Sequence, residues 1–376
     1  MPDLLLPTTL VVRSFYILWV FDRFPVIGSK GNCMRCLVVG GTGFLGGAIV
    51  DALVEGGHLV SILSRGITKA SSIPGVEVIQ ADRYEDLTPL ENKPFDWVFD
   101  TCAFTPEAVE RLLKAIDPAI TRYVLISSVS AYGTFIEDGQ DETATVPDAK
   151  PSDFETAASL SSEDRASAFA YGASYGPLKR ACERKADEML GERATSLRVG
   201  LLVGAGDYSD RLTWWVRRLD QAHDVRQRVP APAPKDRFVQ MIDVKDVAQF
   251  AVRCGNEALT GVWNVTGEPI PMAEVLSQIA EVSNSEAEIV WVEESSIMAA
   301  DIAPWSDIPL MAPSLPEFRC FLSIGTEKAK LAGLTCRPLR ETILPLLSWD
   351  RARRHVPLKC GMKTDQETQL LEASPS

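Results

Sequence analysis

The stretch Gly40-Gly41-Thr42-Gly43-Phe44-Leu45-Gly46 decides the fold of this chain. An apolar run, residues 36–39, precedes it, and a helical pattern, residues 48–54, follows it. Glycines spaced three residues apart let the backbone turn tightly, approach a pyrophosphate and pack the helix directly on the strand. The helix N-terminus then offers free N–H groups to the phosphates. The stretch predicts a dinucleotide-binding turn, and a βαβ turn that binds nothing is the alternative.

Short apolar segments alternate with helical patterns after this turn. Strands are expected at residues 59–63, 76–79, 97–100, 123–127 and 196–204, and helices at 106–116 and 174–190. The alternation predicts an α/β protein with a Rossmann-type, doubly wound parallel sheet and a smaller, mixed C-terminal substrate lobe. Because ligands of such sheets bind at the carboxyl ends of the strands, we expect Thr101–Ala103 and Ser127–Ser128 to face one crevice.

The predicted domain organisation has a core, two excursions and a tail. The Rossmann domain is expected at 34–265, with an acidic loop at 133–170 and a substrate-side excursion at 205–237, followed by a substrate lobe at 266–350 and a loose polar tail at 351–376. The acidic loop is interpreted either as a solvated surface excursion or as a substrate lid. Pro230–Pro234 predicts a stiff connector.

Residues 1–33 are expected to lie outside the fold. Their apolar run, residues 10–21, is interrupted by Arg13 and is too short for a confident membrane span. The segment also lacks the basic region and the small-residue cleavage site of a signal peptide. A peripheral membrane segment or a partner-binding segment is the alternative.

The composition limits the function classes. The net charge of −13 opposes non-specific attraction to nucleic acid or to anionic lipid. The 8 cysteines are scattered along a chain too large to need disulfide staples, which indicates a reducing cytoplasm. Cys33 and Cys36 form the one close pair, and the 3 histidines show no ligand spacing. We therefore expect no metal site and no membrane association.

Tyr175 and Lys179 are the candidate catalytic pair. Their spacing places a phenol and an ammonium on one helix face, where the cation lowers the pKa of the phenol. Such a tyrosine can exchange a proton with a secondary alcohol while a nicotinamide exchanges the hydride. Ser128, at the end of a strand, is expected to hydrogen-bond the same oxygen. The alternative is an exposed pair without a role.

At this point the chain resembles the extended short-chain dehydrogenase/reductases, the nicotinamide-dependent epimerase/dehydratase family, over residues 34–350. The glycine turn, Ser127-Ser128 with Tyr132-Gly133, Tyr175 with Lys179, Leu197-Arg198 leading into Gly204, and Ile242–Ala248 carry the resemblance. The resemblance implies a catalytic set of Ser128, Tyr175 and Lys179, a C-terminal lobe that selects a substrate, often a nucleotide sugar, and a homodimer. Two departures are the long segment between Ser128 and Tyr175 and the missing proline after Arg198.

The resemblance also implies bound NAD or NADP. The expected cofactor-binding residues are Gly40, Thr42, Gly43, Phe44, Leu45, Gly46, Ser64, Arg65, Asp82, Thr101, Ala103, Tyr175 and Lys179. Relatives that use NAD usually carry an acid at the end of the second strand, where this chain has Ser64-Arg65. An arginine there can pair with the 2′-phosphate of NADP, so NADP is preferred. The alternative is an arginine that stacks on adenine and accepts either cofactor.

Three functions remain open on the sequence alone. The first is an NAD(P)-dependent epimerase/dehydratase-like oxidoreductase that acts on a secondary alcohol or ketone. The second is an NADPH-dependent carbonyl reductase, which consumes its cofactor where an epimerase retains it. The third, from another class, is a non-catalytic nucleotide- or RNA-binding relative on the same fold.

Overall fold

The computed structural model describes residues 33–66, 74–116, 119–222, 227–373. Residues 33–376 form one compact unit. The predicted N-terminal extension, except for the exposed Cys33, lies outside the described residues. No helix in these described ranges is both long and apolar enough to cross a membrane.

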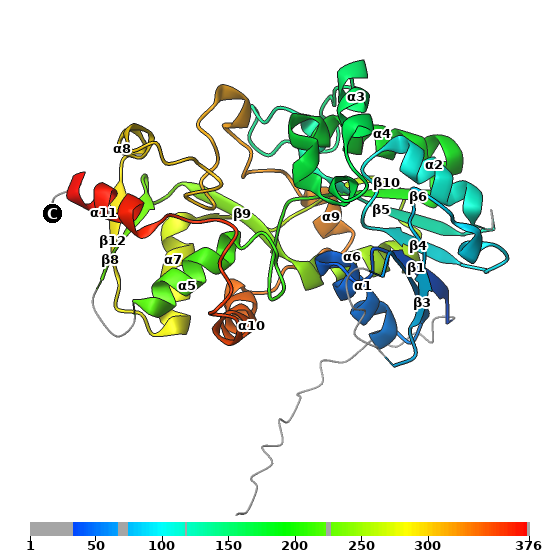
Figure 1. Ribbon diagram of the computed structural model, residues 1–376, viewed down its shortest axis with the longest axis horizontal. Helices are drawn as coiled ribbons and strands as arrows, with labels where there is room; N and C mark the ends of the chain where they lie inside the picture. The colour runs from blue at the N-terminus through cyan, green and yellow to red at the C-terminus, as the bar shows by residue number, and fades with distance from the viewer. Residues whose placement is uncertain (1–32, 67–73, 117–118, 223–226, 374–376) are drawn as a thin grey trace, which may run out of the picture. The chain divides into compact units, whose positions relative to one another are not determined.

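The larger lobe contains a seven-stranded sheet whose strands are all parallel. Its order is β10-β6-β5-β4-β1-β2-β3, so the chain winds outward in one direction from β1 and in the other from β4. The strands are β1 Arg35–Val39, β2 Leu59–Ser64, β3 Glu77–Gln80, β4 Trp97–Asp100, β5 Arg122–Ser128, β6 Ala194–Val199 and β10 Gly261–Val265. The predicted doubly wound, Rossmann-type sheet is thereby confirmed (Figure 1).

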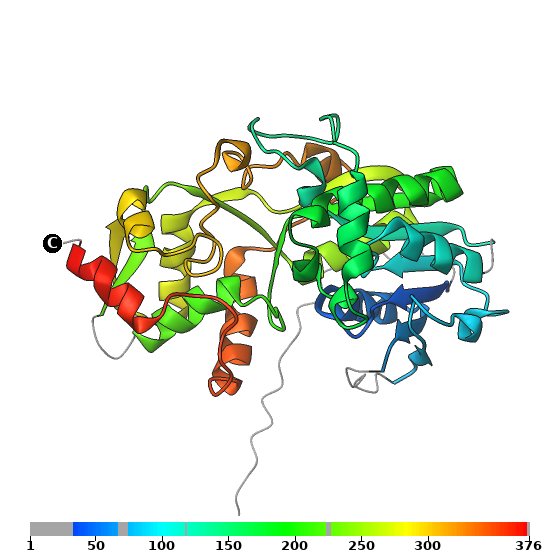
Figure 2. The ribbon, with the colours of Figure 1, turned by 45° about the horizontal axis from the view of Figure 1, so that its top comes forward.

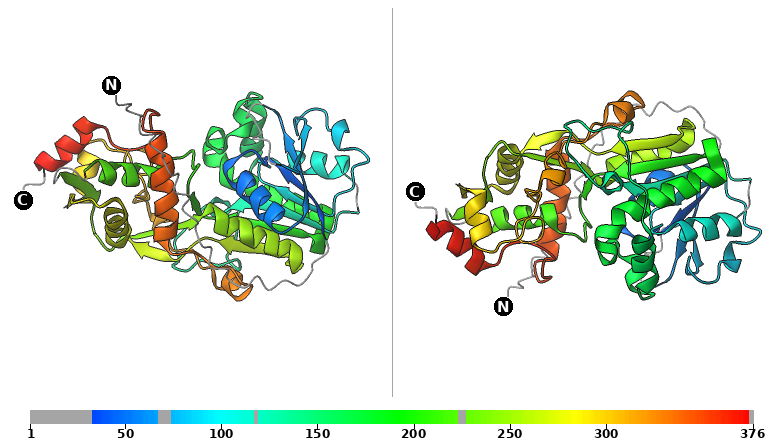
Figure 3. Two further views of the ribbon diagram at one scale, coloured as in Figure 1. Left: turned by 90° about the horizontal axis from the view of Figure 1, so that it is seen from below. Right: turned by 90° about the horizontal axis from the view of Figure 1, so that it is seen from above.

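Helices cover both faces of this sheet, which explains why its strands are continuously apolar. On one face α1 Phe44–Glu55 lies beside α6 Val244–Asn256, and on the other α2 Pro106–Ala115 lies beside α4 Tyr175–Leu190 (Figure 3). Val38 and Ile49 belong to the core of the first face, and Leu37 and Leu112 to that of the second. Successive residues of β1 thus enter opposite cores.

The strands next to the switch point end level with one another. Val39 pairs with Leu63 of β2 and with Asp100 of β4. Because parallel strands share their carboxyl edge, the segments that follow β1, β2 and β4 are neighbours.

The smaller lobe has its own apolar core, which includes Trp215, Leu276 and Ile343. Its elements are α5 Arg211–Gln221, β8 Arg228–Pro232, α7 Met272–Ser283, β12 Glu288–Val292, α8 Glu294–Ala299, α10 Leu339–Ala352 and α11 Thr364–Ala373 (Figure 1). A three-stranded sheet of β7 Leu201–Val203, β9 Phe238–Asp243 and β11 Pro269–Pro271 joins it to the larger lobe. From there α9 Glu327–Leu331 packs back against β10. The predicted mixed C-terminal lobe is present.

The proline-rich connector was a wrong prediction, because Pro230 and Pro232 lie in β8, which pairs in parallel with β12. The backbone N–H of Glu288 donates to Gln227, and that of Ala233 donates to Val292. Hence the odd-numbered residues of β8 bond to β12. The prolines occupy the alternate positions, where a missing N–H costs no ladder bond.

Two other expectations need correction. The predicted strand 196–204 is split at Gly200 into β6 and β7, which join different sheets. A Cβ on Gly200 would lie 2.4 Å from the Thr266 hydroxyl oxygen, so the chain changes sheet where only glycine fits. The described part of the tail is not loose, since it ends in α11, the red helix of Figure 2. Leu370 of α11 is buried in the lobe core, and Glu367 pairs with Arg218 at 2.9 Å.

Candidate active site

A cavity of about 680 Å³ opens at the carboxyl ends of β1, β2, β4 and β5. Residues of both lobes line it. From the larger lobe come the glycine turn, Ser128 and Tyr175, and from the side of the smaller lobe come Asp207, Trp305 and Arg211, the first residue of α5. The structure therefore brings the two sequence-predicted motifs into one space. Their roles there stay predictions.

The glycine turn has the close backbone geometry that a pyrophosphate requires. Gly40 adopts a φ of +81°, and a Cβ on Gly46 would lie 2.1 Å from the carbonyl oxygen of Gly40. No side chain among the described residues caps α1, which leaves the first N–H groups of the helix available to a ligand. A dinucleotide phosphate fits this cradle because the turn offers donors and no side-chain bulk.

Ser64, Arg65 and Asp82 line the cavity at the ends of β2 and β3, where the adenosine of a dinucleotide would lie. The Ser64 hydroxyl accepts from the N–H of Gly66, and the Asp82 carboxylate accepts from the N–H of Tyr84. Arg65 donates to the carbonyl oxygen of Ser162 at 3.2 Å. This end of the cavity thus carries one acid and an arginine without a carboxylate partner among the described residues.

Thr101 and Ala103, both predicted to bind the cofactor, differ in position. Thr101 lines the cavity, and its hydroxyl donates to the carbonyl oxygen of Val39 at 2.8 Å. Ala103 is fully buried and lies outside the cavity lining. Its carbonyl oxygen instead accepts a hydrogen bond from Lys179.

Lys179 is buried on α4 and donates to two main-chain carbonyl oxygens. Its Nζ lies 2.8 Å from the oxygen of Ala103 and 2.5 Å from that of Ile126. Burial lowers the pKa of its ammonium. The side chain therefore ties the segment after β4 to β5.

Tyr175 begins α4 and faces the same cavity as Ser128. Burial raises the pKa of its phenol to about 12, and a hydrogen bond with Ser128 opposes that rise. The expectation that Lys179 lowers this pKa was therefore wrong for the structure as it stands. The ammonium is held by backbone carbonyl oxygens, and desolvation is the largest influence on the pKa of the phenol.

Sequence reasoning missed a buried charge cluster next to the cavity. Arg83 pairs with Asp100 at 2.5 Å, and the Tyr123 hydroxyl donates to the same carboxylate at 2.8 Å. Burial alone would raise the pKa of Asp100, but the Arg83 guanidinium lowers it below its usual range. Asp100, an acid at the end of a buried strand, could have indicated this cluster from the sequence. Its partner Arg83 lies in the segment after β3, so the pairing itself could not be predicted.

A second buried cluster fixes β5 and α4 beneath the site. Glu183 accepts from the Ser127 hydroxyl at 2.6 Å and from Arg198 at 2.7 Å. Of the two adjacent serines, Ser127 is thus committed to a carboxylate. The Ser128 hydroxyl oxygen accepts from the N–H of Ser130 and also hydrogen-bonds Tyr175 in the cavity, which supports the choice of Ser128 as the candidate catalytic serine.

Arg211 is the functional candidate on the substrate side that the sequence did not reveal. Its guanidinium carbon lies 4.8 Å from the ring centre of Trp305 and 5.5 Å from that of Phe169. Its buried Nε has no hydrogen-bond partner, and no carboxylate in the described part of the chain forms an ion pair with it. The cavity therefore presents a desolvated cation between two aromatic rings.

Asp207 lies close to Arg211 in the sequence and in the cavity wall. It is 3% exposed, and its carboxylate accepts from the N–H and the hydroxyl of Ser209. Burial raises its pKa to about 6. A carboxyl group that changes charge near neutral pH is suited to exchange protons.

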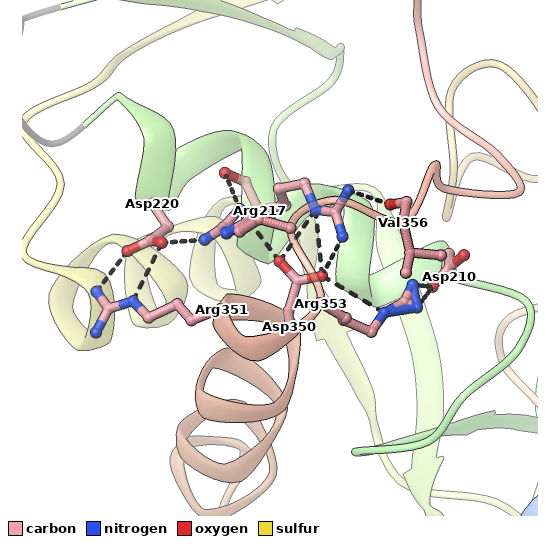
Figure 4. A network of polar contacts seen from close by, with 8 residues as sticks. Asp210, Arg217, Asp220, Asp350, Arg351, Arg353 and Val356 are labelled. Atoms are coloured by element: carbon pink, nitrogen blue, oxygen red, sulfur yellow. Dashed lines mark hydrogen bonds and ion pairs between the residues drawn. The ribbon is translucent and has the colours of Figure 1, made fainter.

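An ion-pair network holds the start of α5, where Arg211 lies (Figure 4). Asp210 accepts from Arg353 at 2.6 Å, and the buried Asp350 of α10 accepts from Arg217 at the same distance. Arg351 pairs with Asp220 at the far end of α5. Because the network joins both ends of α5 to the C-terminal end of α10, it holds the start of α5, and with it Arg211, in place.

Solved structures share this architecture. The Thermus thermophilus UDP-glucose 4-epimerase, solved in complex with NAD, is 19% identical with a TM-score of 0.57, and the match covers 85% of this chain and 100% of that one. The Bordetella bronchiseptica enzyme WbmG, solved in complex with NAD and UDP, is 18% identical with a TM-score of 0.59, over 86% and 96% of the two chains. This chain has the fold of the nicotinamide-dependent epimerases. The resemblance noted in the sequence is thereby confirmed at the level of the fold.

The amino-acid sequence itself matches one protein family and one curated protein. Residues 34–166 match the NmrA-like family. A curated relative, the chloroplast stem-loop binding protein of 41 kDa b from Arabidopsis thaliana, is 26% identical over 260 residues. That match covers 64% of this chain and 60% of the plant protein, so the chain spans less than two thirds of its relative.

Proposed function

We propose that this protein is an NAD(P)-dependent epimerase or dehydratase that acts on a secondary alcohol or ketone of a nucleotide sugar. The observation that carries the proposal is the single cavity shared by the glycine turn, Ser128 and Tyr175. The epimerase fold and the neighbours solved with NAD support a nicotinamide cofactor.

The glycine turn, Ser64, Arg65 and Thr101 would hold the cofactor, which when bound would exchange a hydride with the substrate carbon. With its pKa raised to about 12, Tyr175 is protonated at neutral pH and can donate its proton to a ketone oxygen. Ser128, on the same cavity wall, would hydrogen-bond that oxygen and orient it. Lys179 would support both by fixing the segments after β4 and β5 beneath the cavity.

Arg211 supports an anionic substrate. A guanidinium that pairs with no described carboxylate and lies against aromatic rings is suited to a phosphate or diphosphate group. The exposed rings of Phe169 and Tyr208 at the same cavity offer flat surfaces for a nucleobase or sugar. The UDP and UDP-glucose in the names of the structural neighbours agree with this substrate class.

NADP is the preferred cofactor in this proposal. Arg65 lines the cavity beside Ser64, at the position where an acid would hydrogen-bond the ribose hydroxyls of NAD. Two roles of Arg65 stay open: contact with a 2′-phosphate, or stacking on adenine. The NADPH-dependent carbonyl reductase stays the nearest alternative, and cofactor consumption separates it from an epimerase.

A second candidate function is stem-loop binding without catalysis. The name of the plant relative favours it. The net charge of −13 opposes it, because binding to a phosphate backbone depends on a surplus of cations. A homodimer and a cytoplasmic location also stay predictions, the latter against a relative that is chloroplastic by name.

The test is mass spectrometry of the small molecules released from the purified protein, followed by incubation with UDP-sugars. We expect a nicotinamide dinucleotide in the released fraction and interconversion of one UDP-sugar without net oxidation. Stoichiometric cofactor consumption with a ketone would favour the reductase. Tight binding of a stem-loop RNA, with no dinucleotide binding at all, would favour the second candidate.

A further inference from the structure

The long segment between Ser128 and Tyr175 contributes a wall of the cofactor cavity. Its residues Ser162, Arg165, Ala166, Ala168 and Phe169 line the same cavity as the glycine turn. The segment includes α3 Pro151–Ser159 and the 3-10 helix Ala168–Ser174, which leads into α4 (Figure 1). It is therefore structured, and it borders the adenosine end as well as the substrate end.

An apolar cluster anchors this segment to the body of the larger lobe. Tyr171 and Ala157 are buried against Phe104 and Leu178. The Tyr171 hydroxyl donates to the carbonyl oxygen of Arg165 at 3.0 Å. The backbone of Arg165 is thus held by the buried Tyr171, which fixes the position from which the Arg165 side chain extends.

Two arginines from distant parts of the chain line the cavity near its adenosine end. Arg65 donates to the carbonyl oxygen of Ser162, which joins the end of β2 to this segment. The guanidinium carbon of Arg165 lies 5.4 Å from the ring centre of Tyr84, two residues after Asp82. Both side chains are half-buried and line the cavity. Neither forms an ion pair with a carboxylate in the described residues, whereas the neighbouring Arg83 is paired with Asp100.

We infer that Arg165, together with Arg65, binds the 2′-phosphate of NADP, so that residues 160–172 close over the adenosine end of the cofactor. The inference rests on the proposed function, and it adds a specificity-determining residue from outside the glycine turn and the end of β2. A phosphate monoester carries close to two negative charges at neutral pH and pairs in bidentate fashion with guanidinium groups. Two half-buried cations that form no ion pair with a described carboxylate match that charge, and Asp82, which accepts from the N–H of Tyr84, is the one acid among the described residues that line this end.

The experiment is a calorimetric titration of the full chain with NADP⁺ and with NAD⁺. The variants are Arg65→Ala, Arg165→Ala and the double variant. Arg184→Ala is the matched control, because Arg184 is exposed on α4, pairs with Asp148 and does not line the cavity. We expect Arg165→Ala to weaken NADP⁺ about tenfold and to leave NAD⁺ within about twofold. The double variant should lose less than the product of the single losses, because both arginines contact one phosphate.

The outcomes separate the inference from the proposed function. Equal weakening of NADP⁺ and NAD⁺ by Arg165→Ala would overturn the inference, since it would show stacking on adenine. Unchanged NADP⁺ affinity in Arg165→Ala, with a loss in Arg65→Ala, would also overturn it while leaving the proposed function intact. If wild type binds neither dinucleotide, both are wrong. Arg165→Gln, which keeps a polar side chain over Tyr84, serves if Arg165→Ala does not fold, and the same selective loss of NADP⁺ is expected.

Discussion

The ammonium of Lys179 donates a hydrogen bond of 2.8 Å to the carbonyl oxygen of Ala103. A second bond, to Ile126, makes this buried side chain the link between the segment after β4 and β5. The lysine therefore shapes the cavity floor through the backbone, in addition to any charge it supplies to Tyr175.

Lys179→Met should lower the free energy of unfolding as well as the turnover rate. The change leaves two buried carbonyl oxygens without their donor, which costs about 1–3 kcal/mol of unfolding free energy. Urea unfolding measures this loss. Lys185→Met is the control on the outer face of α4, where Lys185 pairs with the exposed Glu188. A Lys179→Met protein as stable as the control would contradict the linking role.

Tyr175→Phe should keep the fold and the cofactor affinity but lower turnover by roughly 10²–10⁴, the usual range for general acid–base catalysis. The matched control is Tyr132→Phe, because Tyr132 is buried outside the cavity lining. Steady-state kinetics on the same substrate compares the two. Turnover of Tyr175→Phe close to wild type would remove this phenol from the mechanism.

Asp207→Asn should change how stability depends on pH. Because burial raises the pKa of Asp207 to about 6, its neutral form is favoured in the folded state, and the protein loses stability as the pH rises from about 4 through about 6. The loss is on the order of 2–3 kcal/mol. Asp207→Asn should lack this loss, whereas Asp236→Asn, at an exposed position before β9, should retain it. Urea denaturation at pH 4 and pH 7 measures the free energy of unfolding of each protein. The same pH dependence in wild type and Asp207→Asn would contradict the prediction.

Arg211→Ala should raise KM for a nucleotide sugar roughly tenfold or more while changing kcat less, because a charge-assisted contact to phosphate is lost. Arg340→Ala, an exposed position on α10 paired with Glu281, is the control. Arg353→Met should raise KM in the same direction by a smaller factor, since it releases Asp210 and so the start of α5. An unchanged KM in Arg211→Ala would place the substrate phosphates elsewhere.

Local patterns were sufficient to predict the larger lobe. The structure of the glycine turn and of each short apolar strand depends on only a few consecutive residues. Accordingly, β1, β2, β4 and β5 lie at the positions predicted from the sequence. Gly46 illustrates why, because the 2.1 Å approach to Gly40 is a short-range constraint that only glycine meets.

Long-range contacts were not predictable in the same way. Pro230 and Pro232 indicate a connector until β12 is seen to pair with their odd-numbered neighbours. Arg211, Phe169 and Trp305 come from three segments, and nothing in any one of them indicates the stack they form. The orientation of Lys179 likewise depends on carbonyl oxygens of residues far away in the sequence.

The decisive measurement is an equilibrium titration of NADPH, followed by its fluorescence, into wild type and into Tyr175→Phe. We expect saturable binding of equal affinity to both proteins, and turnover of a UDP-sugar that is roughly 10²–10⁴ lower in Tyr175→Phe than in wild type. Absence of saturable binding of NADPH and NADH to wild type, or equal turnover by the two proteins, would contradict this expectation.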